Sequence, residues 1–165
     1  MDTTCFNQLI KHLRPKMYRF ALSLVRQSDE AEDVVQDISL KLWERSMGIT
    51  DNIRSVEAYA MKAVKNRCLD YLRRQPGKLE ELTESVRIDP TPLQSLEQAD
   101  MAAFVRKLIE KLPLQQQMII RLRDVEEYEL DEIADILDMN EGAVRTGLSR
   151  ARRKIREQLT IHHEW

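Results

Sequence analysis

The sequence predicts an all-α fold of two small helical domains joined by a flexible linker, with a helix-turn-helix in the C-terminal domain. Its 165 residues include only 4 Gly and 5 Pro, and 33% of them are charged, a mixture that favours helices. Apolar residues recur at helical spacing, and no stretch is typical of a strand. Gln75–Pro92 has Pro-Gly at one end and two prolines at the other, as linkers do. We therefore expect domains at residues 1–75 and 94–165 with a linker at 76–93, although the length alone also allows one domain.

Two helices with apolar stripes are expected at the N-terminus. The first runs from Phe6 to Val25, and Pro15 is expected to divide it or to begin its second half. The second opens at Asp29, which has Glu32 in the capping-box position three residues later. Its inner stripe consists of Ala31, Val34, Val35, Ile38 and Leu42, and its outer face carries Asp29, Glu30, Asp33, Gln36, Asp37 and Glu44. From the residues alone, the simplest interpretation of this acidic face is a solvated surface.

A basic and partly aromatic helix is expected next. Gly48–Ser55 is predicted to be a loop, and Ser55 is predicted to cap a helix from Val56 to about Arg74. The polar and aromatic side chains of this helix are Tyr59, Lys62, Lys65, Asn66, Arg67, Tyr71, Arg73 and Arg74. Cations that hold phosphates, together with rings that stack on bases, suit single-stranded nucleic acid. Tyr59 and Tyr71 could equally be core residues.

The C-terminal half is predicted to contain two helices followed by a helix-turn-helix. The two helices are expected at Leu93–Lys111 and Leu114–Leu122, with Pro113 as the first residue of the second one. The helix-turn-helix falls in Tyr128–Glu157, where both helices have an apolar stripe and Asn140 can cap the second helix. The second helix of such a motif normally enters the DNA major groove.

Charge is segregated along the chain, although the net charge is only −2. Residues 124–141 contain nine acids and no base, whereas residues 142–156 contain six bases and no acid. Such blocks indicate separate faces for separate partners. Cys5 and Cys68 are too far apart in sequence to suggest a zinc site or a disulfide framework. Because no apolar run is long enough to span a membrane, we expect a cytoplasmic protein without membrane insertion, metal or cofactor.

Three motifs cover most of the chain. They are DEAEDVVQDISLKLWER at Asp29–Arg45, AYAMKAVKNRCLDYLRR at Ala58–Arg74, and LPLQQQMIIRLRDVEEYELDEIADILDMNEGAVRTGLSRARRKI at Leu112–Ile155. In this order they resemble a bacterial extracytoplasmic-function (ECF) sigma factor. The two domains then correspond to those that the family calls sigma-two and sigma-four. The resemblance implies a non-enzymatic protein that binds RNA polymerase core, directs it to specific promoters and helps to open the DNA.

The resemblance also implies partners for the two N-terminal faces. The acidic helix is expected to dock on the clamp coiled coil of the largest polymerase subunit through Asp33, Gln36, Asp37, Lys41 and Trp43. Trp43 also remains a candidate core residue. The flap of the second-largest subunit is a further expected contact. The basic helix is expected to recognise and melt the proximal promoter element through Tyr59, Lys62, Asn66, Arg67, Asp70, Arg73 and Arg74.

By the same resemblance, the second helix of the helix-turn-helix reads the distal promoter element. Arg145, Thr146, Ser149 and Arg150 are expected to face the major groove, and Arg152, Arg153 and Arg156 to hold phosphates. Gly147 departs from the family pattern. It should weaken the helix by about 1 kcal/mol relative to alanine, and it could let the backbone approach DNA closely. An anti-sigma factor is a further expected partner.

Two other classes of function fit the sequence less well. A freestanding helix-turn-helix regulator would bind a symmetric operator without polymerase, but it gives no reason for an acidic and a basic motif in the N-terminal half. An enzyme would need a catalytic or metal-binding pattern. His12, His162 and His163 have no metal-ligand spacing to a Cys or carboxylate, and no nucleophile motif or Gly-rich phosphate loop is present.

Overall fold

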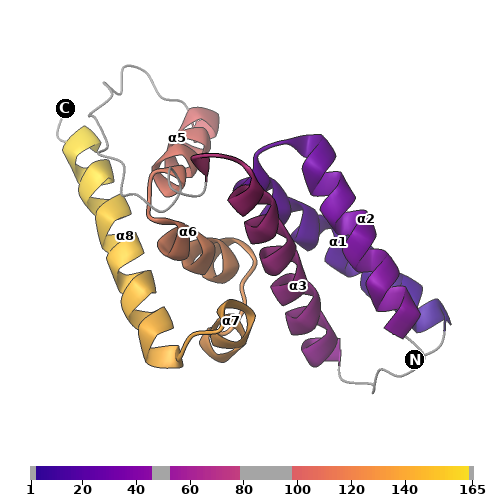
Figure 1. Ribbon diagram of the computed structural model, residues 1–165. Helices are drawn as coiled ribbons and strands as arrows, with labels where there is room; N and C mark the ends of the chain where they lie inside the picture. The colour runs from indigo at the N-terminus through magenta and orange to yellow at the C-terminus, as the bar shows by residue number, and fades with distance from the viewer. Residues whose placement is uncertain (1–2, 46–52, 79–97, 164–165) are drawn as a thin grey trace. The chain divides into compact units, whose positions relative to one another are not determined.

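The computed structural model describes residues 3–45, 53–78 and 98–163. These residues form seven α-helices and one π-helical turn and contain no strand, so the predicted all-α class is confirmed (Figure 1). The chain divides into two compact units, which are described separately. One comprises Met1–Pro76 with Asp131–Met139, and the other comprises Gly77–Leu130 with Asn140–Trp165. No helix in the described ranges is long and apolar enough to cross a membrane.

Three long helices form the body of the first unit. They are α1 (Thr3–Val25), α2 (Ser28–Arg45) and α3 (Ile53–Arg74), and each packs on the other two (Figure 1). The predicted inner stripe of α2 is buried throughout. The core also contains Leu13, Met17, Phe20, Met61, Val64, Cys68 and Leu72. A shorter helix, α7 (Leu130–Leu137), buries Ile133, Ile136 and Leu137.

Helix α1 runs through Pro15 without a break, so the expected division at this residue is wrong. A proline inside a helix removes one backbone hydrogen bond and crowds the carbonyl of the residue four positions earlier. Pro15 is exposed, whereas Leu13 and Met17 on either side of it are completely buried. Burial of one continuous apolar stripe therefore outweighs a local cost that falls on the solvent side of the helix.

Two helix starts differ from the expected ones. α2 begins at Ser28 rather than Asp29, because the carbonyl of Gln27 already accepts a helical hydrogen bond of 3.0 Å. α3 begins at Ile53, so Ser55 lies in its first turn and does not cap it. A small polar residue fits a cap or a first turn, and the sequence alone could not distinguish the two.

The second unit contains α5 (Gln98–Glu110), α6 (Leu114–Ile120) and α8 (Glu141–His163), which pack on one another (Figure 1). Its buried apolar residues include Leu108, Leu112, Ile119, Leu122, Val144, Leu148 and Ala151. Pro113 has a ψ of 146°, which is an extended conformation. It therefore precedes α6 as the N-cap and is not the first helical residue that the sequence suggested.

The helix expected at Leu114–Leu122 ends in a wider turn, η1 (Arg121–Val125). The N–H of Glu126 donates to the carbonyl of Arg121 at 3.0 Å, which closes a π-type turn. Glu127 then has a φ of 63°, in the left-handed region. This turn determines where the side chain of Asp124 lies relative to α8.

Most of the expected linker lies outside the described residues, which stop at Lys78 and resume at Gln98. The start of the helix expected at Leu93–Lys111 and most of the loop expected at Gly48–Ser55 also lie outside them. Within the described part, Gly77 follows α3 with a φ of 79°, a conformation that favours glycine.

Candidate functional site

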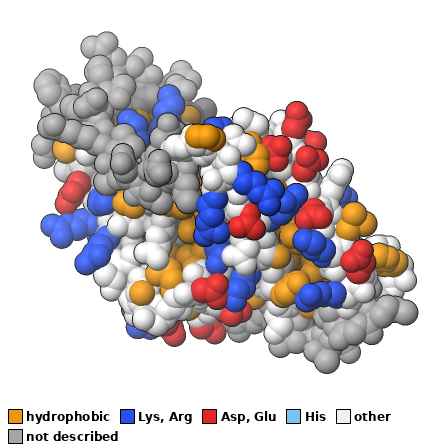
Figure 2. Space-filling model, viewed as in Figure 1, with side chains coloured by type: hydrophobic (Ala, Val, Ile, Leu, Met, Phe, Trp, Pro, Cys, Tyr) orange, Lys and Arg blue, Asp and Glu red, His pale blue; other side chains and the backbone are white. Residues whose placement is uncertain are grey.

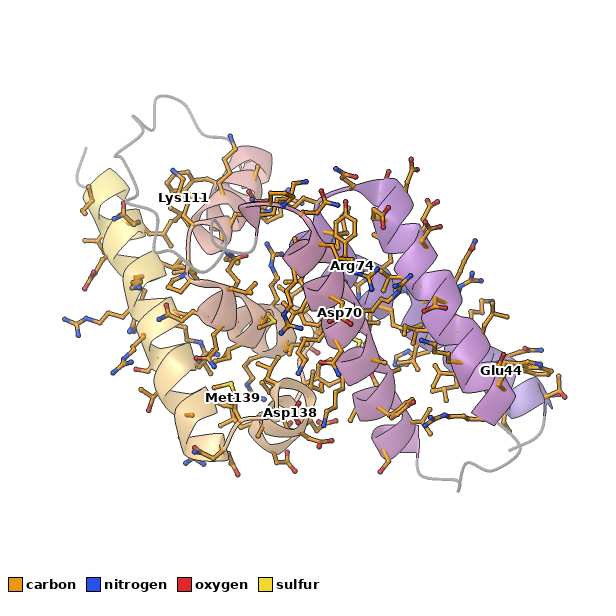
Figure 3. All side chains as sticks on the ribbon, in the orientation of Figure 1. Glu44, Asp70, Arg74, Lys111, Asp138 and Met139 are labelled. Atoms are coloured by element: carbon orange, nitrogen blue, oxygen red, sulfur yellow. The ribbon has the colours of Figure 1, made fainter. Side chains whose placement is uncertain are left out.

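Helix α8 begins at a capped turn. Oδ1 of Asn140 accepts a hydrogen bond of 2.7 Å from the N–H of Ala143, so the predicted cap is confirmed. In the turn before it, Asp138 has a φ of 54° and the N–H of Met139 donates to the carbonyl of Ala134 at 2.9 Å. Asp138 and Met139 lie at the end of α7 (Figure 3). Three residues thus separate α7 from α8, a short turn of the kind that a helix-turn-helix requires.

The residues predicted to contact the distal element lie on the exposed part of α8. They are Arg145, Thr146, Ser149, Arg150, Arg152, Arg153 and Arg156, and each has an exposed side chain. Nη2 of Arg145 lies 3.0 Å from Glu141 Oε1, and Nε of Arg153 lies 3.1 Å from Glu157 Oε1. Exposed pairs four residues apart on a helix contribute only about 0.3–0.5 kcal/mol. These arginines can therefore exchange a carboxylate for a phosphate or a base at little cost.

Arg152 differs from the other arginines because Asp124 holds it in place. Nε of Arg152 donates to Oδ2 of Asp124 at 3.1 Å, and a second hydrogen bond joins Nη2 to Oδ1. The hydrogen bonding with Asp124 raises the pKa of Arg152 above its already high ordinary value. Asp124 could not be identified from the sequence, because the two residues are 28 positions apart and their pairing depends on the π-turn.

Gly147 faces the core of the second unit. A Cβ atom at this position would lie 2.5 Å from Cδ1 of Ile119 on α6. This contact gives Gly147 a packing role within the second unit, which the sequence did not indicate. At this point the glycine leaves room for the end of the Ile119 side chain, which would have to shift to accommodate a methyl group on α8.

The residues predicted to contact the proximal element lie on one side of α3. Tyr59, Asn66, Arg67, Asp70, Arg73 and Arg74 are exposed, and Lys62 is partly exposed. Figure 3 shows Asp70 and Arg74 in the C-terminal half of this helix. Nη1 of Arg73 lies 3.1 Å from Oδ1 of Asp70. Lys and Arg side chains gather over α3, and acidic side chains lie over the neighbouring helix α2 (Figure 2).

The two tyrosines of α3 have different environments. Tyr59 is 40% exposed, and the guanidinium of Arg45 lies over its ring at 5.2 Å from the centroid. Tyr71 is partly exposed, and its hydroxyl donates to Oε1 of Gln27 at 3.5 Å. Neither tyrosine is a fully buried core residue, and the ring of Tyr59 is accessible for stacking.

The acidic side of α2 carries two exposed apolar side chains. Asp33, Gln36 and Lys41 are exposed there, as predicted for a solvent-facing surface. Trp43 is 47% exposed, and its ring meets that of Phe6 edge-on at a centroid distance of 5.1 Å. It is therefore not a fully buried core residue.

Leu40 is 62% exposed on the same helix, and it was not among the predicted polymerase-binding residues. Helical spacing alone indicates that Leu40 is exposed, because it lies off the apolar stripe that contains Ile38 and Leu42. Large apolar side chains on an otherwise charged surface are typical of a protein-binding site.

Asp37 connects α2 with α3. Its Oδ2 lies 3.3 Å from Nζ of Lys41 on the same helix and 3.4 Å from Nε of Arg67 on α3. The carboxylate thus joins a residue predicted to bind polymerase to a residue predicted to bind promoter DNA.

An open groove of about 690 Å³ lies between α1 and α2. Its apolar lining comes from Ile10, Pro15 and Val35, while Lys11 and Arg14 contribute positive charge and Glu32 contributes negative charge. Gln36 lines one edge of the groove. The groove is thus continuous with the acidic side of α2.

Comparison with known families identifies both halves of the chain. Residues 9–76 match Sigma-70 region 2, and residues 105–155 match Sigma-70, region 4. The chain is 30% identical to the RNA polymerase sigma factor SigV of Bacillus subtilis (strain 168) over 148 residues, which are 87% of this chain and 84% of SigV. It is 28% identical over 154 residues to the ECF RNA polymerase sigma factor SigM of Mycobacterium tuberculosis (strain ATCC 25618 / H37Rv), covering 93% of this chain and 76% of SigM.

A solved structure has the same fold. It is the sigma factor RpoE of Bartonella quintana in complex with the anti-sigma factor NepR. The similarity covers 96% of this chain and 99% of that chain, with a TM-score of 0.72 and 25% sequence identity.

Proposed function

The chain belongs to the extracytoplasmic-function (ECF) sigma factors, which direct RNA polymerase to promoters, and we propose how its helices divide this work. Polymerase binding and promoter opening are assigned to a domain of residues 1–75. Recognition of the distal promoter element is assigned to a domain of residues 94–165, and residues 76–93 link the two. The matches to region 2 at residues 9–76 and to region 4 at residues 105–155 support these boundaries.

Helix α8 is proposed to read the distal element in the major groove. Arg145, Thr146, Ser149 and Arg150 are assigned to base edges, and Arg152, Arg153 and Arg156 are assigned to phosphates. The exposure of all seven side chains and the Asn140 cap at the start of the helix support this assignment. Arginine has five N–H donors, so Arg152 keeps free donors for a phosphate while Asp124 fixes its orientation.

Helix α3 is proposed to bind the proximal element as its strands separate. The assigned residues are Tyr59, Lys62, Asn66, Arg67, Asp70, Arg73 and Arg74. Tyr59 offers an exposed ring on which an unstacked base can lie, and the neighbouring cations attract the phosphate backbone. Capture of an extruded base converts binding free energy into strand opening.

Helix α2 is proposed to dock on the clamp coiled coil of the largest polymerase subunit. The assigned residues are Asp33, Gln36, Asp37, Lys41 and Trp43, to which we add Leu40. A half-exposed tryptophan and an exposed leucine within an acidic face combine an apolar anchor with charge selectivity. The C-terminal domain is proposed to contact the flap of the second-largest subunit.

An anti-sigma factor and a cytoplasmic location complete the proposal. The Bartonella quintana sigma factor that shares this fold was solved with its anti-sigma factor NepR, and that relative is matched over 99% of its length. The partner of the present chain would cover the DNA-binding or polymerase-binding residues named above. Co-purification from the native host tests this part of the proposal.

The whole proposal is supported by one observation: the side chains assigned to polymerase and to DNA lie on solvent-accessible sides of α2, α3 and α8. Run-off transcription with purified core polymerase tests it. Promoters would first be selected from a DNA library in the presence of core and this chain. We expect initiation at selected promoters that depends on both proteins. Absence of initiation at every selected promoter, or selection of symmetric sites by the chain alone, would contradict the proposal.

A further inference from the structure

We propose that Asp37 is a positioning residue that holds Arg67 away from promoter DNA until polymerase engages the Asp37 carboxylate. The inference rests on the proposed function, in which α2 binds polymerase and α3 binds the proximal element. The inference directly connects polymerase binding by α2 with DNA binding by α3. Polymerase binding would release a cation onto the DNA-binding side of α3.

One carboxylate oxygen of Asp37 contacts a cation on α2 and a cation on α3. Oδ2 of Asp37 lies 3.4 Å from Nε of Arg67 and 3.3 Å from Nζ of Lys41. Arg67 stands next to Asn66 on α3, among the residues assigned to the proximal element. While Asp37 is free of polymerase, its charge draws the Arg67 guanidinium toward α2. A positively charged polymerase group at Asp37 would compete with both cations for the same carboxylate.

The strength of this ion pair suits a reversible switch. The side chains of Asp37 and Arg67 are 37% and 43% exposed, so water screens their attraction. Exposed pairs of this kind contribute little to stability, and a phosphate can replace such a carboxylate readily. The pair therefore lowers DNA affinity by a small factor without preventing DNA binding once polymerase is present.

Asp33 provides a matched control on the same helix. It is exposed, it lies one helical turn before Asp37, and no ion pair joins it to α3 in the described residues. Asp33→Asn and Asp37→Asn change the net charge equally. A difference between these variants therefore reports the position of the charge and not its amount.

The experiment measures binding of the full-length chain, without polymerase, to a short dye-labelled single-stranded DNA of mixed sequence over a range of salt concentrations. Asp37→Asn should bind about two- to fivefold more tightly than Asp33→Asn at low salt, as expected for release of one exposed ion pair. Its salt slope should be steeper by about 0.7, which is one additional phosphate contact on a single strand. Asp37→Glu should behave like the wild-type chain.

The Arg67→Gln substitution shows whether the change in DNA binding caused by Asp37→Asn depends on Arg67. In an Arg67→Gln background, the difference between Asp37→Asn and Asp33→Asn should disappear. Equal DNA affinity and salt slope for Asp37→Asn and Asp33→Asn in the wild-type background would overturn the inference, as would a difference that persists without Arg67. Circular dichroism of each variant confirms that it is folded.

Binding of the same variants to core polymerase separates this inference from the proposed function. Under the proposed function, Asp33→Asn and Asp37→Asn both weaken core binding. If core binding is unchanged while the DNA effect appears, the docking proposal fails, and with it the release of Arg67 by polymerase, whereas the positioning of Arg67 by Asp37 stands. If core binding weakens while the DNA effect is absent, the docking proposal stands and the inference fails.

Discussion

Gly147 on α8 lies so close to Ile119 on α6 that a Cβ atom on the glycine would stand 2.5 Å from Cδ1 of the isoleucine. Ile119 is completely buried, so its side chain has little room to move. Glycine inside a helix normally costs about 1 kcal/mol relative to alanine. At this position the close packing of two helices favours the residue that local helix propensity disfavours.

The substitution Gly147→Ala should therefore destabilise the protein. We expect the free energy of unfolding to fall by up to about 2 kcal/mol, because overpacking of a core costs about 1–3 kcal/mol and the gain in helix propensity offsets about 1 kcal/mol of it. Urea denaturation followed by circular dichroism measures the change. A chain stabilised by about 1 kcal/mol, as at an open helical position, would show that the contact with Ile119 is relieved without strain.

Ile119→Val provides the matching control, since valine lacks the Cδ1 atom that meets position 147. Alone, it should cost about 0.5–1.5 kcal/mol for the lost methyl group. Combined with Gly147→Ala, it should be less destabilising than the sum of the two single changes, because the new methyl group enters the vacated space. Simple additivity would indicate that the two positions do not interact.

Local patterns were sufficient to predict most of the fold. The apolar stripe of α2 and the Asn140 cap depend on residues within a few positions of each other, and both were identified from the sequence. The side of α3 that carries Tyr59 and Arg67 was also identified, because the helical period determines which side chains share a face.

Features that depend on a distant partner could not be predicted in this way. The Asp124–Arg152 pair requires a π-turn in one segment and a helix 28 positions later. The packing role of Gly147 requires the position of Ile119 on another helix, whereas the sequence indicated only a locally weakened helix. Pro15 was expected to interrupt α1, because the local cost of proline is visible in the sequence and the burial that outweighs it is not.

Arg145 and Arg153 should have different effects on DNA recognition. Arg145→Gln should relax sequence preference at one position of the distal element, with a loss of discrimination of about 1–3 kcal/mol. Arg153→Gln should weaken binding to all sequences alike and reduce the salt slope by about one. Competition binding of promoters recovered by selection, repeated at several salt concentrations, measures both quantities.

Lys154→Gln is the charge-matched control for this comparison. Lys154 lies beside Arg153 in sequence but about 100° further around α8, and it is less exposed than Arg153. We expect it to leave sequence preference unchanged and to alter the salt slope less than Arg153→Gln does. If Arg153 proves to control sequence preference and Arg145 only the salt slope, the proposed rotation of the helix against DNA is wrong.

The two cysteines should differ strongly in reactivity. Burial raises the pKa of the Cys68 thiol to about 12, whereas Cys5 is exposed near the start of α1. The thiolate is the reactive form, so at about pH 8 the Cys68 thiol is protonated as well as inaccessible. Ellman's reagent should modify one thiol rapidly in the folded chain and both in denaturant. A Cys5→Ser chain that still reacts rapidly when folded would contradict the burial of Cys68.

Leu40 and Leu42 allow the proposed polymerase-binding surface to be tested with two identical substitutions on one helix. Leu40 is 62% exposed, whereas Leu42 is completely buried. Leu40→Ala should change the free energy of unfolding by less than about 0.5 kcal/mol, as expected for a surface site. Leu42→Ala should lower it by about 2–5 kcal/mol, because it leaves a cavity in the core of the first unit.

For chains that remain folded, Leu40→Ala should weaken binding to core polymerase more than Leu42→Ala does, which is the opposite of their order in stability. If Leu40 is an apolar anchor for the polymerase clamp, Leu40→Ala should weaken core binding by about tenfold, the effect of a 1.4 kcal/mol interface contact. Leu42→Ala, measured where circular dichroism shows a folded chain, should bind nearly as well as the wild type because its side chain does not reach the surface. Unchanged core binding by Leu40→Ala would remove Leu40 from the proposed docking surface. The exposed leucine would then need a different partner, for which an anti-sigma factor is the next candidate to test by the same substitution.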